Sequence, residues 1–116
     1  MSSQSNSEII QYGKTCIEVE LNSLNNLVHV IDNNFADAVR LILNSKGRVV
    51  ITGIGKSAII AQKIVATMNS TGTPSIFMHA ADAIHGDLGM IQTGDSVICI
   101  SKSGDTPEIK VLVPLI

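Results

Sequence analysis

The segment Arg48-Val-Val-Ile-Thr-Gly-Ile-Gly-Lys-Ser57 joins a run of mostly β-branched residues to a turn that carries two glycines. The run shows no alternation of polar and apolar residues, a pattern typical of a strand that is buried on both faces. Residues 57–69 then place apolar side chains at three- and four-residue steps, which predicts a helix. A buried strand leading through a glycine turn into a helix is typical of open α/β sheets, so this segment predicts that fold class.

A later segment repeats the pattern. Ser96-Val-Ile-Cys-Ile-Ser101 predicts a second strand–turn unit, and Pro107 suits the first position of the next helix, where a missing N–H has no cost. Between the two units, Ser75–His79 predicts a further strand. Right-handed crossovers in a doubly wound parallel sheet give the strand order 2-1-3. The two glycine turns would then be neighbours at the carboxyl edge of the sheet, where such folds bind their ligands.

Helices are predicted before this sheet, over residues 8–46. One apolar stripe runs from Ile9 to Ile31, and a second follows Asp32, which we expect to cap the second helix. Gly47 is expected to end that helix as its C-cap glycine. The polar residues 1–7 predict a disordered tail.

The last residues predict that the domain continues. Val97-Ile-Cys-Ile100 would form an exposed apolar sheet edge, and Pro114 is expected to kink the final helix, which lacks a polar ending. We therefore expect residues 47–116 to be the front part of a longer domain whose remainder is missing. The alternative is a short protein that covers this edge by forming oligomers.

Composition excludes several kinds of partner. The chain has 116 residues, 45% of them hydrophobic, and a net charge of −2, which suits one globular domain without general attraction to nucleic acid or anionic membranes. No apolar run reaches the roughly 20 residues of a membrane span, and the N-terminus lacks a secretory pattern. Cys16 and Cys99 have no CxxC spacing and indicate two buried, unpaired thiols in a reducing cytoplasm.

The turn after the later strand is the strongest candidate for an anion site. The hydroxyls of Ser101, Ser103 and Thr106 surround Gly104, and Lys102 lies among them. Hydroxyls, backbone N–H groups and a helix N-terminus are the donors that a phosphate dianion needs. The alternative is an ordinary turn that is rich in Ser and Thr because these residues cap helices.

The earlier turn, Gly53-Ile-Gly-Lys-Ser57, fits three templates in part. A nucleotide P-loop would need a glycine where Val50 stands, and a dinucleotide fold expects an acidic residue where His79 closes the next strand. The third template is a glycine turn that presents Lys56 and Ser57 to a sugar phosphate. We favour this third interpretation because the other glycine turn would lie beside it.

Two histidines lie close together in the sequence. The spacing of His79 and His85 is not that of a helical zinc motif, so no metal site is predicted, although His85 is the one candidate ligand. Either imidazole could transfer a proton or polarise a carbonyl, since histidine titrates near neutral pH. The alternative is a histidine that only bonds to loop backbone. Gly55, Lys102 and His79 are further candidate substrate contacts.

These motifs resemble the sugar isomerase (SIS) domain of D-arabinose 5-phosphate isomerases, a flavodoxin-like fold. The resemblance extends from about Gly47 to the C-terminus. Its strongest element is His85-Gly-Asp-Leu-Gly-Met90 downstream of the GxGKS turn. It also includes Val49-Val-Ile-Thr-Gly-Ile-Gly-Lys-Ser57, Ser70-Thr-Gly-Thr-Pro-Ser75 and Ile100-Ser-Lys-Ser-Gly-Asp-Thr106.

The resemblance implies reversible conversion of D-ribulose 5-phosphate to D-arabinose 5-phosphate without a redox cofactor. It implies that this reaction feeds Kdo synthesis for lipopolysaccharide or capsule, and that the protein is a homo-oligomer such as a tetramer. It also implies two sets of site residues. The phosphate contacts would be Ser57, Ser101, Ser103 and Thr106, and the catalytic residues Lys56, His85 and Glu108.

The chain departs from the family pattern. Lys102 and Asp105 stand where the family often has Asn and Glu. The remainder of the sheet, which supplies a further glutamate and histidine in the family, and the tandem CBS pair of many members are missing, so whether this chain alone is active stays open. Two other functions fit the same turns: a non-catalytic sugar-phosphate sensor and a nucleotide-binding module.

Overall fold

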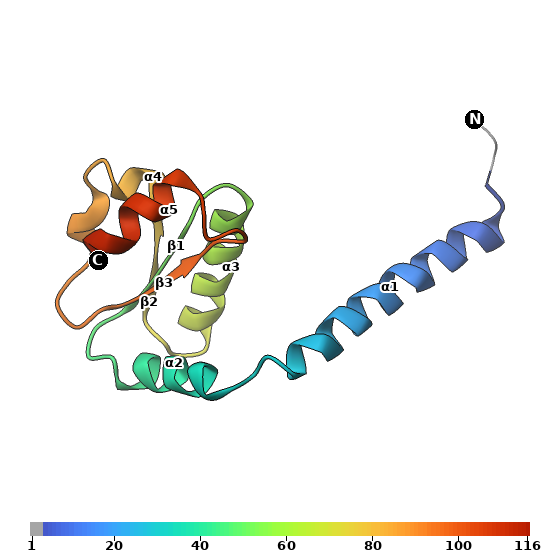
Figure 1. The fold of residues 1–116 in the computed structure, drawn as a ribbon, viewed down its shortest axis with the longest axis horizontal. Coiled ribbons are helices and arrows are strands. Elements are labelled where there is room, and N and C mark those ends of the chain that lie inside the picture. Colours follow the sequence, from blue (N-terminus) through green and yellow to red (C-terminus); the bar gives the residue numbers. More distant parts are fainter. Residues whose placement is uncertain (1–3) are drawn as a thin grey trace. The chain divides into compact units, whose positions relative to one another are not determined.

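A three-stranded parallel sheet with the order β2-β1-β3 organises the C-terminal part of the chain (Figure 1). The computed structural model describes residues 4–116. The strands are β1 (Val49–Gly53), β2 (Ser75–His79) and β3 (Ser96–Ile100). Both neighbours pair with β1 in parallel. The predicted fold class and strand order are therefore confirmed.

The connections between strands are helical. Helix α3 (Lys56–Ser70) leads from β1 to β2, and α4 (Ala80–Ala83) with the 3₁₀-helix η1 (Asp87–Met90) lies between β2 and β3. Helix α5 (Pro107–Leu112) follows β3, with Pro107 in its first turn. The chain then tightens into the 3₁₀-helix η2 (Val113–Leu115), because Pro114 lacks the N–H that an α-helix would need.

Both faces of the sheet are covered. On one face, Val50 packs in a buried cluster with residues of β2, α4 and α5. On the other face, Val49 and Ile51 pack with Ala61 of α3. Figure 1 shows α3 on one side of the strands and α4 and α5 on the other. All five residues of β1 are buried, which explains why its sequence shows no polar alternation.

The chain divides into two compact units, Met1–Val39 and Arg40–Ile116. The helices are α1 (Asn6–Val28) and α2 (Asn33–Asn44). As predicted, Asp32 caps α2, accepting the N–H of Asn34 at 2.9 Å. No helix within residues 4–116 is long and apolar enough to cross a membrane.

Several local predictions for the helices were wrong. Helix α1 begins at Asn6, inside the expected tail, because Ser5 and Glu8 form a capping box; residues 1–3 lie outside the described residues. It ends at Val28 rather than Ile31. Cys16 on this helix is exposed rather than buried, whereas Cys99 is half-buried, and both thiols are free.

Gly47 is not a C-cap glycine, since its φ is not positive. A residue without a side chain is needed here for a different reason. A Cβ atom at this position would clash with Oδ1 of Asp95 and lie 2.7 Å from the Asp95 backbone nitrogen. Gly47 therefore allows the chain before β1 to lie directly against the chain before β3.

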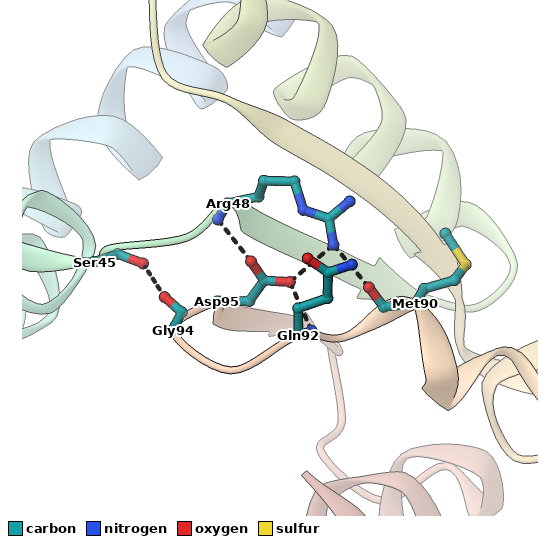
Figure 2. Close-up of polar contacts among 6 residues, drawn as sticks. All are labelled: Ser45, Arg48, Met90, Gln92, Gly94 and Asp95. Carbon is teal, nitrogen blue, oxygen red and sulfur yellow. Dashed lines mark hydrogen bonds and ion pairs between the residues drawn. The ribbon is translucent and has the colours of Figure 1, made fainter.

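Figure 2 shows the polar cluster at this contact, which we call the Arg48–Asp95 clamp. The Asp95 carboxylate accepts the backbone N–H of Arg48 at 2.7 Å and that of Gln92 at 2.9 Å. The Arg48 guanidinium donates to the same carboxylate at 3.0 Å and to the Met90 carbonyl at 2.8 Å. The Asp95 side chain is only 2% exposed, so the clamp fixes the end of the β2–β3 connection to the start of β1.

The clamp predicts how stability depends on acid. The N–H of Gln92 and then the Arg48 groups lower the pKa of Asp95 from 3.8 to about 2. Because the folded-state pKa lies below the unfolded value, the stabilisation is fully present above about pH 4 and is lost as the pH falls through 2. We expect the free energy of unfolding, measured by urea titration and circular dichroism, to fall over this window.

Asp95→Asn should be less stable at pH 6 and show a flatter profile between pH 4 and 2. Asp82→Asn, at the one exposed residue of α4, is the control and should keep the wild-type profile. An Asp95→Asn protein with the wild-type slope would contradict the assignment.

Candidate functional site

The strand register brings the two glycine turns together. Gly53 at the end of β1 is paired with His79 at the end of β2 and with Ile100 at the end of β3. A Cβ on Gly53 would lie 3.2 Å from the Ile100 carbonyl oxygen. The turns that follow β1 and β3 therefore begin side by side at the carboxyl edge, which confirms the predicted placement.

The turn after β1 ends at the N-terminus of a long helix. Gly55 is the N-cap of α3 with φ 58° and ψ −130°, a conformation that strongly favours glycine. Its carbonyl accepts the N–H of Ala58 at 3.1 Å. Lys56 is exposed and Ser57 half-buried in the first turn of α3. Both side chains therefore lie at the N-terminus of α3, where the helix dipole is positive.

In the turn after β3, the serines stabilise the turn itself. The Ser101 hydroxyl oxygen accepts the Gly104 N–H at 2.9 Å, and the Ser103 hydroxyl oxygen accepts the Asp105 N–H at 3.1 Å. Gly104 has φ 67°. These bonds support the alternative that this is an ordinary turn rich in Ser and Thr. In both bonds, however, the serine oxygen is the acceptor. The hydroxyl protons can still be donated to an anion.

Thr106 differs from the two serines. It is the N-cap of α5, yet its side chain makes no capping bond. Its Oγ1 atom is buried and has no hydrogen-bond partner. Unsatisfied buried hydroxyls are uncommon in folded proteins, because each carries a desolvation cost. The Thr106 hydroxyl therefore makes no structural hydrogen bond and is available to donate one to an anion at the predicted site.

Thr52, the residue before Gly53, has a second unsatisfied hydroxyl. It is fully buried, and its Oγ1 has no partner. Thr52 is not among the predicted site residues, although it is the one polar residue in the apolar run 49–54. A single polar residue among apolar ones was the sequence signal that could have identified Thr52.

The local charge is nearly balanced. Asp105 forms an ion pair of 2.6 Å with Lys110 on α5, so part of its repulsion towards an anion is offset. Both side chains are exposed, which makes the pair weak and sensitive to salt. Lys102 is exposed.

The histidines lie in different surroundings. The Nδ1 atom of His79 accepts the Ala81 N–H at 3.2 Å, which caps α4, and the ring stands edge-on to Phe77. The alternative that a histidine only bonds to backbone therefore explains the contact of one ring nitrogen of His79. His85 is exposed between α4 and η1.

The proposed catalytic residues come from three elements: Lys56 from α3, His85 from the β2–β3 connection, and Glu108, half-buried, from the first turn of α5. No hydrogen bond or ion pair joins these three side chains within residues 4–116. In the same part of the chain, no group of three or more metal-ligating side chains could hold a metal ion.

One cavity lies away from this edge, at the amino end of the strands. Its volume is about 180 Å³. It is lined by Ile42, Leu43, Ser45, Gly47, Val49, Gly72, Thr73 and Pro74. None of the predicted site residues lines this cavity.

The parallel sheet, with two glycine turns at its carboxyl edge, defines an α/β domain. Residues 41–116 match the SIS domain, and the chain belongs to this family. The arabinose 5-phosphate isomerase KdsD of Pseudomonas aeruginosa is 45% identical over 116 residues, which is all of this chain and 36% of the relative. GutQ of Shigella flexneri, also named arabinose 5-phosphate isomerase, is 42% identical over 91% of this chain and 33% of its own length.

A solved structure is also similar. An Escherichia coli CFT073 protein in complex with arabinose 5-phosphate has a TM-score of 0.89 and 41% identity, covering 97% of this chain and 60% of that one. The chain spans about a third of the length of the curated relatives it matches.

Thr106→Val tests whether the unpaired hydroxyl serves an anion. Removing an unsatisfied buried hydroxyl should change the free energy of unfolding by no more than about 1 kcal/mol. Affinity for inorganic phosphate, measured by calorimetry, should fall about tenfold or more, as expected for one charge-assisted hydrogen bond. Thr67→Val is the control, since the Thr67 hydroxyl bonds only to the Lys63 carbonyl on α3. Unchanged phosphate affinity in Thr106→Val would remove this residue from the site.

Proposed function

We propose that this chain forms the phosphate-binding part of an aldose–ketose isomerase that interconverts D-ribulose 5-phosphate and D-arabinose 5-phosphate. The observation that carries the proposal is the pairing of Gly53 with Ile100, which sets two donor-rich turns side by side. The complex of a similar protein with arabinose 5-phosphate supports the choice of ligand. The names of the curated relatives support the reaction.

The substrate phosphate is held at the carboxyl edge. Ser101, Ser103 and Thr106 donate from one turn, and Ser57 donates from the other. The N-terminus of α3 adds favourable electrostatics for an anion. Phosphate binding of this kind supplies binding energy far from the reacting carbons and fixes their geometry.

The reaction moves protons and needs no external oxidant. A base removes the proton from C2 of the aldose, giving an enediolate, and a proton is returned to C1 while the hydroxyl proton passes from O2 to O1. Lys56 and His85 stabilise or relay the charge on the two oxygens. Glu108 acts as the base or orients it. No electron pair leaves the substrate, so a redox cofactor has no part in this scheme.

We extend the proposal to the setting of the enzyme. The product feeds Kdo synthesis for lipopolysaccharide or capsule in the cytoplasm. The protein works as a homo-oligomer, for example a tetramer. Within residues 4–116 β3 pairs only with β1, which leaves its other edge open to pairing with another subunit.

Ligand-dependent thermal shifts test the class of function. The entire gene product should be stabilised by D-arabinose 5-phosphate and D-ribulose 5-phosphate and more weakly by inorganic phosphate. At 100 times the dissociation constant the gain is about 2.7 kcal/mol. Stabilisation by NAD alone would contradict the proposal. Binding without interconversion of the two pentose phosphates would favour the sensor function instead.

Lys56→Ala tests the chemistry in the same protein. We expect kcat to fall about 10²–10⁴-fold, the usual range for a group that assists proton transfer. The circular dichroism spectrum should not change, because Lys56 is exposed. Lys63→Ala, an exposed lysine further along α3, is the matched control and should keep wild-type turnover. Near-normal activity of Lys56→Ala would exclude the proposed role.

A further inference from the structure

The segment that carries His85 has little structure of its own. Between β2 and β3, α4 and η1 each contain four residues. Only Ala80 and Ala83, at the start of the connection, are buried, and no residue of η1 is. His85 and Gly86 are exposed, and Gly86 has φ 138°. Burial therefore fixes the beginning of the connection but not the part around His85.

The apolar residues that follow add limited support. Ile84, Leu88 and Ile91 pack against the cluster formed by Val50, α4 and α5, but each is only partly buried. Something else must fix the backbone between His85 and β3.

The Arg48–Asp95 clamp holds the far end of this segment (Figure 2). The Arg48 guanidinium donates to the carbonyl of Met90, the last residue of η1. The Asp95 carboxylate accepts the N–H of Gln92, two residues later. The Gly94 carbonyl accepts the Gly47 N–H at 2.8 Å and the Ser45 hydroxyl at 2.8 Å. Met90, Gly94 and Asp95 are thus bonded to the chain that leads into β1, and Gln92 is bonded to Asp95.

The ion pair of the clamp is largely buried. The Asp95 side chain is 2% exposed and Arg48 34%. A single nitrogen, Nη2 of Arg48, reaches both the Asp95 carboxylate and the Met90 carbonyl. Charge-assisted bonds of this kind are stronger than neutral ones.

From this geometry we infer that Arg48 and Asp95 are positioning residues that hold the His85–Met90 segment and so place His85 for the reaction. The inference rests on the proposed function of His85. Neither residue can touch a ligand at the carboxyl edge. They precede β1 and β3, and each strand extends about 13 Å from its first residue to its last. Their effect reaches His85 through the Met90 carbonyl and the backbone of η1.

Amide hydrogen exchange tests the clamp without any ligand. Arg48→Met removes the donor and keeps much of the side-chain volume, so the amides of residues 85–92 should exchange at least tenfold faster relative to those of β1 and β3. Arg48→Lys should restore most of the protection, because one nitrogen makes both bonds. Lys46→Met removes an exposed neighbouring cation and should have no effect. Asp95→Asn serves as a second variant should Arg48→Met fail to fold.

Equal protection of residues 85–92 in wild type and both clamp variants would overturn the inference. So would a uniform rise in exchange across residues 85–92 and all three strands, since that result would mean a purely global loss of stability.

Kinetics of the entire gene product tests the link to His85. Arg48→Met should lower kcat at least tenfold and change KM less than twofold, because the phosphate turns lie on other segments, and Arg48→Lys should recover kcat. A loss in KM alone, or no loss in kcat, would overturn the positioning role. Absence of turnover and of pentose phosphate binding in the wild type would instead defeat the proposed function, while the exchange experiment would still decide whether the clamp holds the segment.

Discussion

The pairing of β1 with a strand on each side is the constraint on which the structure depends. Because β1 is central and buried on both faces, its position fixes both neighbours, and the register carries Gly53 to the same level as His79 and Ile100. The candidate site is a product of that register. A shift of one residue would separate the two turns and reverse the faces on which the side chains of β1 pack.

The two ends of β1 differ in the contacts that they make. Before its first residue, Arg48 and Gly47 contact the chain ahead of β3 through charge and close backbone approach. After its last residue, the two glycine turns and the N-terminus of α3 lie at the carboxyl edge. Charged contacts at the amino end and glycine turns at the carboxyl end agree with the rule that open α/β sheets bind ligands at the carboxyl edge.

The sheet and its turns could be predicted because their signals are local. β-branched runs define the strands, and glycines with positive φ mark the turns at Gly55 and Gly104. The clamp could not be predicted, since Arg48 and Asp95 are 47 positions apart and only the fold brings them together. The start of α1 is different: Ser5 and Glu8 have the spacing of a capping box, so this signal was present and was missed. The mutual placement of Lys56, His85 and Glu108 depends on packing that sequence patterns do not encode.

The two glycine turns belong to strands that are far apart in the sequence, and this has a consequence for the lifetime of the protein. An anion that contacts both turns can bind only after β1 and β3 have paired, so occupancy and folding are thermodynamically linked. Abundant ligand would lower the population of opened molecules that proteases can cut. A fall in the concentration of such a ligand would then shorten the half-life of the protein.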